Sequence, residues 1–388
     1  MAMKTYLMRY LPKIEDVTIN ETLSNWQAQF PRMGVCALLP EAMKASVPEL
    51  QAACARRRVP LVGGIFPALL KNGEFLTEGV WLLCFPEMPY FALHDNLPTA
   101  AKETELITER IATEIRAQID HTPDVTLFLL FDAMVPNIAT LLDQLYLQLA
   151  NRVHYAGANA GSETFQPMPC LFDGERIVQN GLLLMLLKPH RGAILEHGYR
   201  APAHNVYATS TTGNRITQID WRPAFEVYQE LVRAQYHVEI TAENFYQLAV
   251  HFPFGIVRAN HHVVVRIPVA LHEDGSLFCV GEVPANSMLT LLEAPEVDSQ
   301  ETLRVLIDGM TLLNGDPAGS ELLLFYCAGR RLHLGIEAAT SELRDFSART
   351  KAAQVSGAVS LGEIGGSTLQ GYPLFQNATL VASSWPKV

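Results

Sequence analysis

Short, uninterrupted apolar runs are the feature that most constrains the fold of this chain. Such runs occur at residues 34–39, 80–85, 125–131, 182–187 and 322–327. Each has the length of a β-strand, and none approaches the ~20 residues that a membrane-spanning helix requires. The runs therefore predict buried strands within a layered fold.

Helical periodicity separates several of these runs. Ile107, Ile111, Ile115 and Ile119 recur every four residues, which places them on one side of a helix, with the charged residues elsewhere. Helices and strands alternate early in the chain, and strands predominate later. This order predicts an α/β fold with mixed sheets and helices packed on the sheets, and it disfavours a purely parallel, doubly wound sheet. No internal repeat is evident in the sequence.

The helix–strand pattern restarts near residue 220, where a helix is predicted at 224–234. A chain of 388 residues is long enough for two or three domains. We therefore expect a two-lobed protein, with one domain at residues 30–215 and a second domain at residues 221–382.

Composition limits the classes of partner. Lys and Arg number 29 against 40 Asp and Glu, which gives a net charge of −11 at pH 7. A general binder of nucleic acid or of anionic membranes needs a basic surface, so neither is expected as a partner. Hydrophobic residues make up 49% of the chain and charged residues 18%, a balance that excludes global disorder.

The six cysteines are scattered singly, and no C-x-x-C pair occurs. This spacing removes the usual sequence signal for zinc ribbons, iron–sulfur clusters and thioredoxin-like redox pairs. Residues 1–10 lack the basic region and the apolar stretch of a secretion signal. We therefore expect six free thiols in a cytoplasmic protein.

The standard catalytic and phosphate-binding motifs are absent. The sequence contains no G-x-x-x-x-G-K-[ST], no G-x-S-x-G and no H-E-x-x-H. Cys327, which is followed by Arg330 and Arg331, offers one alternative, because two guanidinium groups would activate its thiolate in a hydrolase. The simpler interpretation is a buried cysteine at the end of a strand, and we expect a binding protein instead of an enzyme.

The histidines are concentrated in one segment, which contains His190, His197 and His204. Imidazole is a common ligand of metals and of haem iron, although each of these histidines is more often an ordinary polar residue. The segment precedes the expected boundary, and ligand sites favour crevices between domains. Tyr199 and Arg200 would serve haem propionates or the carboxylate of an amino acid. We therefore expect the binding site in this segment.

Two carboxylates, Glu342 and Glu363, stand in apolar stretches. Buried carboxylates usually have a partner, and Arg266 and Arg330 are the candidates. We expect Arg330 and Glu363 to be interior groups that pair with each other, or groups that hold a small zwitterionic ligand.

Several short motifs, in order along the chain, resemble the FIST family. The C-terminal half carries Phe325-Tyr-Cys327-Ala-Gly-Arg330, Glu342-Leu, Gly362-Glu363-Ile364 and Asn377-Ala-Thr379-Leu. The junction carries Tyr199-Arg200-Ala-Pro202, Thr209, Gly213-Asn214 and Trp221-Arg222-Pro223-Ala224 with Tyr228. The N-terminal half is matched by Leu61-Val-Gly63-Gly64 and Tyr155-Ala-Gly157-Ala. The resemblance covers roughly residues 30–380. It departs from the family at Trp221, where glycine is usual, and at His204, where the family often has glycine.

The resemblance implies a FIST N-like domain at 30–215 and a FIST C-like domain at 221–382. It implies a sensory signal-transduction protein that binds a small ligand and regulates a partner histidine kinase. Because the chain is also similar to the haem-binding, nitric-oxide-sensing group of this family, haem b is the expected cofactor. The alternative is a non-haem module for an amino-acid-like molecule, and a homo-oligomer is compatible with both.

The residues expected to bind the ligand, whichever of the two it is, are His197, Tyr199, Arg200, His204, Arg330 and Glu363. Either His197 or His204 would ligate the haem iron.

Overall fold

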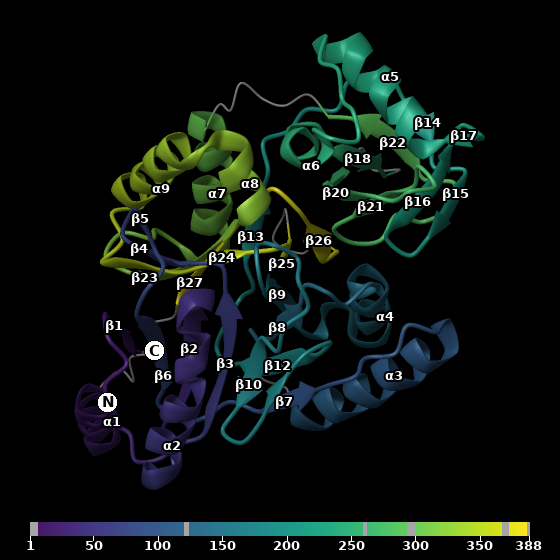
Figure 1. Ribbon diagram of the computed structural model, residues 1–388. Helices are drawn as coiled ribbons and strands as arrows, with labels where there is room; N and C mark the ends of the chain where they lie inside the picture. The colour runs from purple at the N-terminus through teal and green to yellow at the C-terminus, as the bar shows by residue number, and fades with distance from the viewer. Residues whose placement is uncertain (1–6, 120–123, 259–261, 293–298, 367–371, 386–388) are drawn as a thin grey trace.

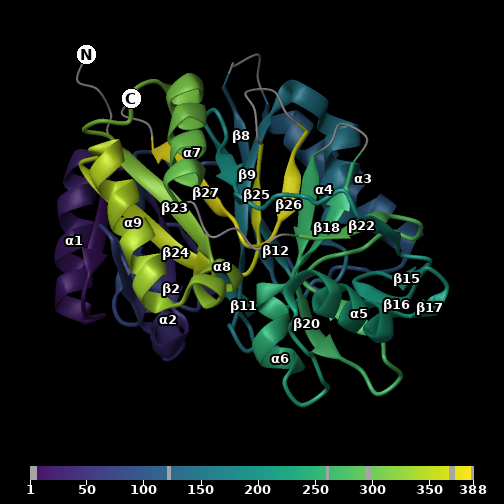
Figure 2. The same ribbon diagram turned by 90° about the horizontal axis from the view of Figure 1, so that it is seen from above.

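Three six-stranded sheets form the core of the protein, and a smaller lobe with two antiparallel sheets lies beside it (Figure 1). The computed structural model describes residues 7–119, 124–258, 262–292, 299–366 and 372–385. Helices lie around the outside of the core sheets (Figure 2). The structure confirms the predicted α/β fold with mixed sheets and helices packed on them.

Three consecutive copies of one topology build the core. Each copy runs through a strand, a helix, a strand, a further helical segment, a third strand, a hairpin and a final strand. The first copy comprises β1 (Leu7–Leu11), α1 (Asp16–Gln29), β2 (Gly34–Pro40), η1 (Glu41–Ser46), α2 (Val47–Arg57), β3 (Leu61–Phe66), β4 (Leu69–Lys71), β5 (Glu74–Leu76) and β6 (Val80–Phe85). The second comprises β7 (Phe91–His94), α3 (Ala101–Gln118), β8 (Thr126–Asp132), α4 (Ile138–Leu149), η2 (Ala150–Arg152), β9 (His154–Ala160), β10 (Leu171–Asp173), β11 (Ile177–Val178) and β12 (Leu182–Leu187). The third comprises β13 (Ile194–Glu196), α7 (Ser299–Asn314), β23 (Glu321–Cys327), α8 (Ala328–Leu334), α9 (Ile336–Thr350), β24 (Gln354–Ser360), β25 (Glu363–Gly365), β26 (Leu374–Gln376) and β27 (Leu380–Trp385).

The three copies exchange their hairpins. The strand orders are β1-β6-β2-β3-β10-β11, β7-β12-β8-β9-β25-β26 and β13-β27-β23-β24-β4-β5. The hairpin of the second copy therefore completes the first sheet, that of the third copy completes the second sheet, and that of the first copy completes the third sheet. This exchange closes a ring, so no core sheet is complete within one copy.

The two ranges expected as domains, 30–215 and 221–382, both contribute strands to the core sheets. β4 pairs with β24, and β9 pairs with β25. Whether each range folds as a separate unit stays a prediction.

A glycine occupies the same register position in the parallel strand pair of each copy. Gly63 lies in β3, Gly157 in β9 and Gly357 in β24. A Cβ atom at these three positions would lie 2.2, 2.0 and 1.8 Å from a carbonyl oxygen of the neighbouring strand. The close approach of the paired strands therefore requires glycine, and these residues are a trace of the repeat in the sequence.

Aromatic side chains from all three copies meet inside the core. The ring centroid of Phe325 lies 5.6 Å from that of Phe66 and 6.2 Å from that of Phe128. The opposite faces of the second and third sheets pack against helices of their own copy, α3 with α4 and α7 with α9. Burying one such phenylalanine contributes about 1.5–3 kcal/mol, so this cluster stabilises the association of the copies.

The smaller lobe, which we call the inserted lobe, interrupts the third copy between β13 and α7. Its two sheets have the orders β14-β22-β18-β19 and β15-β16-β21-β20. Its elements are β14 (Val206–Tyr207), β15 (Ser210–Thr212), β16 (Arg215–Ile219), β17 (Arg222–Pro223), α5 (Ala224–Tyr236), α6 (Phe245–Leu248), η3 (Ala249–His251), β18 (Phe254–Val257), β19 (Val263–Arg266), β20 (Pro268–Leu271), β21 (Leu277–Cys279) and β22 (Met288–Leu291). Helix α5 confirms the helix predicted at 224–234.

Two further expectations concern the whole chain. All six cysteines are buried and free, as their scattered spacing predicts. In the described part of the chain, no helix has both the length and the apolar character that crossing a membrane requires.

Candidate functional site

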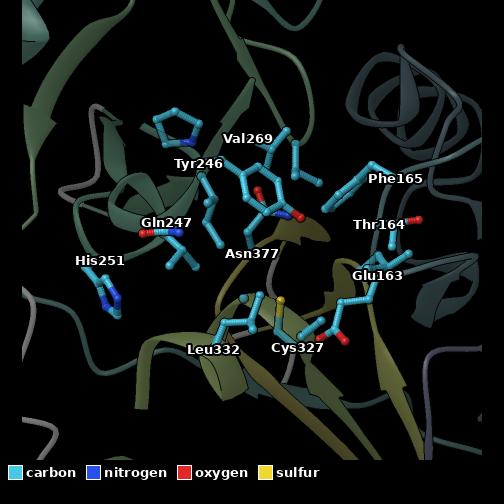
Figure 3. A pocket seen from close by; sticks show the side chains of 17 residues that line it. Glu163, Thr164, Phe165, Tyr246, Gln247, His251, Val269, Cys327, Leu332 and Asn377 are labelled. Atoms are coloured by element: carbon cyan, nitrogen blue, oxygen red, sulfur yellow. The ribbon is translucent and has the colours of Figure 1, made fainter. Parts of the chain in front are cut away.

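A cavity of about 440 Å³, which we call the junction cavity, lies between the core and the inserted lobe (Figure 3). Its walls are mainly apolar. The core contributes Glu163, Thr164, Phe165, Cys327, Ala328, Gly329, Leu332, Leu361 and Asn377. The inserted lobe contributes Tyr246, Gln247, Val250, His251, Ile267, Pro268, Val269 and Val280. A hollow of this size between two structural units is a common setting for a small-molecule site.

Cys327 lines the cavity at the point where β23 ends and α8 begins. Its sulfur accepts the backbone N–H of Ala378 at 3.1 Å, and the backbone amides of Gly329 and Arg330 also bond to it. Burial nevertheless raises the pKa of the Cys327 thiol far above its usual value, so the group is a neutral thiol at pH 7. This state is typical of a structural cysteine and not of an activated nucleophile.

A buried carboxyl group, that of Glu363, lies behind Cys327. It accepts a hydrogen bond from the hydroxyl of Ser360 at 2.5 Å and another from the hydroxyl of Thr379, and the Cys327 side chain also bonds to it. Burial raises the pKa of Glu363 to about 7, against the lowering effect of these hydrogen bonds. The carboxyl group therefore changes its protonation state near neutral pH.

Arg330 is buried as predicted, but the expected pair with Glu363 is wrong. The guanidinium group instead holds Glu342 of α9 at two points, with Nε–Oε2 and Nη2–Oε1 distances of 2.8 and 2.6 Å. Burial by itself raises the pKa of Glu342, but the hydrogen bonds and the positive charge of Arg330 outweigh it and lower that pKa. The remaining nitrogen, Nη1, donates to the carbonyl of His197 at 2.7 Å. Glu363 instead has the hydroxyl groups of Ser360 and Thr379 as its partners.

A pair of histidines connects the inserted lobe to the core beside the cavity. Nδ1 of His251 in η3 lies 3.0 Å from Nδ1 of His333 in α8. Burial, with smaller contributions from His251 and Arg330, lowers the pKa of His333 to about 4, and burial also lowers the pKa of His251. Both rings are therefore neutral at pH 7 and form one N–H···N hydrogen bond.

Glu163 is a charged side chain in the cavity wall. One guanidinium nitrogen of Arg331, Nη2, lies 2.7 Å from Oε1 and 2.9 Å from Oε2 of Glu163. The guanidinium carbon of Arg331 lies 5.3 Å from the ring centre of Phe75. The Glu163 side chain is 32% exposed. In Figure 3, Glu163 and Cys327 lie on the core side of the cavity, across from Tyr246.

The structure brings together only some of the residues expected to bind a ligand. His197 and Tyr199 have ring centroids 6.0 Å apart, and Arg330 bonds to the His197 carbonyl through Nη1. His197 and Tyr199 line a second hollow, of about 350 Å³. Among the described residues, this hollow shares no lining residue with the junction cavity. Arg200 and His204 are exposed on the loop that leads to β14 and line neither hollow.

Of the two expected haem ligands, His197 has its ring engaged in hydrogen bonds, whereas His204 is exposed. An iron ligand needs an imidazole nitrogen with a free lone pair. Nδ1 of His197 accepts the backbone N–H of Tyr199 at 2.9 Å, and the ring also bonds to the backbone of Val263. His204 is exposed on its loop. Neither residue fits a buried iron ligand in this arrangement, and haem binding stays a prediction from the resemblance.

Metal binding by a cluster of side chains has no support in the described residues. Among them, no three His, Cys, Asp or Glu side chains are grouped as a metal site requires.

Sequence reasoning missed most of the cavity wall. Glu163, Tyr246 and His251 lie in segments with no motif, and only the docking of the inserted lobe brings them together. Cys327 and Asn377 did carry a signal, because both belong to motifs shared with the FIST family. The amide nitrogen of Asn377, oriented by its hydrogen bonds, donates to the carbonyls of Val280 and Val265 in the inserted lobe.

Comparison with known families gives the class of the protein. Residues 33–222 match the FIST N domain, and residues 224–366 match the FIST C domain. The chain therefore belongs to the FIST family, whose domains are sensory signalling modules. The wall of the junction cavity draws on both matched ranges. No curated protein matches the chain.

Proposed function

We propose that this protein is a sensor that binds one small molecule in the junction cavity and does not transform it. The observation that carries the proposal is a hollow of about 440 Å³ whose wall is shared by the core and the inserted lobe. A ligand held there contacts both units at once, so its binding energy favours one arrangement of the two.

Helix α8 gives such a ligand a route to the rest of the protein. Ala328, Gly329 and Leu332 line the cavity. The two residues between Gly329 and Leu332 anchor other elements: Arg330 holds α9, and Arg331 holds the loop after β9. We infer that occupancy of the cavity shifts α8 and, with it, the contacts that these side chains make.

Of the two ligand classes expected from the sequence, the geometry supports the non-haem small molecule. The part of the cavity wall that the structure describes has neutral His251 and no lysine or arginine side chain, whereas haem propionates favour cationic partners. Haem with nitric oxide as its signal remains the second hypothesis, and it rests on the resemblance alone. Titration with haemin tests it directly: a Soret band that His197→Ala or His204→Ala abolishes would favour haem, and a band that both variants retain unchanged would show that neither residue ligates the iron.

The partner histidine kinase is also part of the proposal. Tyr246 and Leu332 at the cavity, with Ile336 at the start of α9, are large apolar side chains that are 64%, 51% and 58% exposed. Exposed apolar groups of this size favour contact with another protein. A kinase that docks here would respond directly to the state of α8.

A thermal-shift screen of small molecules tests the proposal, with Leu332→Trp as the variant that fills the cavity mouth. A true ligand at about 100 times its Kd stabilises the folded state by about 2.7 kcal/mol, so it raises the Tm of the wild type. We expect no rise for Leu332→Trp. Leu312→Trp, at an exposed position of α7 outside the cavity, should respond like the wild type. Hits that stabilise Leu332→Trp and the wild type equally would contradict the proposal.

A further inference from the structure

The charge of the cavity wall restricts the chemistry of the ligand. Among the described residues that line the junction cavity, Glu163 is the only Asp, Glu, Lys or Arg. A second carboxyl group, that of Glu363, lies behind Cys327 and is fully buried. Within the described lining, the wall therefore presents one carboxylate, whose ion-pair partner Arg331 is not a lining residue, and no other Asp, Glu, Lys or Arg side chain.

The ion pair with Arg331 leaves Glu163 able to bind a further cation. A carboxylate has about four acceptor positions, and Arg331 reaches the two oxygens with a single nitrogen, Nη2. The side chain of Arg331 is 15% exposed and lies against the ring of Phe75, so the guanidinium group is held in place outside the cavity. Glu163 is thereby fixed in position with unused acceptor positions.

The rest of the wall suits an apolar body. Phe165 and Val269 lie on the same side of the cavity, and Tyr246 presents its ring nearby (Figure 3). Ile267 and Val280 add aliphatic surface. Aromatic faces attract a nearby cation as well as apolar groups. An apolar molecule that ends in an ammonium group would satisfy both parts of the wall.

An anionic ligand would bind poorly in this cavity. Its carboxylate would lose water on entering an apolar hollow, with no lysine or arginine in the wall to replace that water. It would also face the carboxylate oxygens of Glu163, which accept hydrogen bonds and donate none. A free amino acid carries this cost on its carboxylate even if its ammonium group reaches Glu163.

We propose that the junction cavity selects small organic amines: a protonated amine bonds to Glu163, and its apolar body fills the space beside Phe165 and Val269. This inference rests on the proposed function, since it names the ligand class of the same site. Carboxylates and free amino acids of the same size are rejected.

Calorimetric titration with three probes of similar shape and different charge tests the inference. The probes are 2-phenylethylamine, 3-phenylpropionate and L-phenylalanine. We expect the Kd of the amine to be at least about tenfold lower than that of either other probe. Glu163→Gln should raise the Kd of the amine at least about tenfold. Glu87→Gln, which removes an exposed carboxylate paired with Arg32, should leave that Kd unchanged.

A second variant keeps the test valid if Glu163→Gln unfolds. Gln247 is exposed and lines the cavity, so Gln247→Lys adds a cation without disturbing the Glu163–Arg331 pair. We expect Gln247→Lys to weaken binding of the amine and to strengthen binding of 3-phenylpropionate.

The failure of the ligand class and the failure of the site give different results. If 3-phenylpropionate or L-phenylalanine binds as tightly as the amine, and Leu332→Trp abolishes that binding, the site stands and the amine inference is wrong. If no probe binds, the amine inference is wrong. If Leu332→Trp leaves the binding of every probe unchanged, both the amine inference and the proposed site are wrong.

Discussion

Arg330 and Glu342 form a two-point ion pair inside the protein, with side chains that are 2% and 0% exposed. The pair joins the start of α8 to α9, and the hydroxyl of Tyr326 donates to the same carboxylate at 2.6 Å. Through Nη1, Arg330 also bonds to the loop that carries His197. Removing one partner of such a pair leaves an uncompensated buried charge.

Arg330→Ala should therefore lower the free energy of unfolding by about 3–5 kcal/mol. The matched control is Arg304→Ala, which breaks exposed pairs with Glu301 and Asp308 and should cost far less, because solvent screens exposed ion pairs. Urea unfolding of the three proteins measures both values. Equal, small losses for the two variants would mean that the Arg330 pair does not hold the junction.

Glu363 should make stability fall as the pH rises. Its pKa is raised from 4.5 to about 7 in the folded state, so the folded protein keeps a proton that the unfolded chain has lost. The stabilisation is complete below pH 4.5, and it disappears as the pH rises through about 7. We expect the wild type, compared with Glu363→Gln, to lose about 1–3 kcal/mol between pH 5 and pH 8. Urea unfolding at each pH measures the free energy of unfolding of the two proteins. If the difference between them stays constant from pH 5 to pH 8, the assignment to Glu363 is wrong.

The histidine pair should have the opposite pH dependence. The pKa of His333 is lowered from 6.5 to about 4 in the folded state, so its stabilising effect is present above pH 6.5 and is lost as the pH falls toward 4. Acidification from pH 7 to pH 5 should lower the Tm of the wild type more than that of His333→Phe. His272→Phe, an exposed position in the inserted lobe, is the control and should follow the wild type. Identical Tm losses for the wild type and His333→Phe would count against this role.

The glycine of the repeated strand pair should not tolerate a side chain. Gly157→Ala would place Cβ 2.0 Å from the carbonyl oxygen of Leu129, and the strands would have to separate. We expect a loss of about 3 kcal/mol or more. Gly174→Ala is the control, because a Cβ there meets no atom within 4 Å. A Tm of Gly157→Ala as high as that of Gly174→Ala would show that the strand pair has room for a side chain.

Local patterns in the sequence were sufficient for the elements but not for their assembly. The apolar run at 182–187 is strand β12. The isoleucine stripe lies in α3 except for Ile119, which follows the last residue of the helix. The threefold repeat was not visible, because strand partners such as β4 and β24 are nearly 300 residues apart and periodicity carries no information about pairing. The three glycines of the repeat are its trace, but a single glycine in a strand is equally typical of a bulge or a tight bend.

The sequence predicted residues near the candidate site only where a charged residue stands within an apolar stretch. Arg330 and Glu363 stand in apolar surroundings, so their burial could be inferred. Arg330 was a candidate partner of both Glu342 and Glu363, and the local sequence could not decide between them, because Glu342 reaches Arg330 only through the turn between α8 and α9. His251 and Glu163 come to the cavity through the docking of an inserted lobe, and no local pattern encodes that contact.

A crystal structure of the protein with the most strongly stabilising amine tests the central claim most directly. The account predicts electron density for the compound in the junction cavity, between Phe165 and the inserted lobe, with its nitrogen within hydrogen-bond distance of the Glu163 carboxylate. Density in the second hollow, beside His197 and Tyr199, with the junction cavity empty, would contradict it.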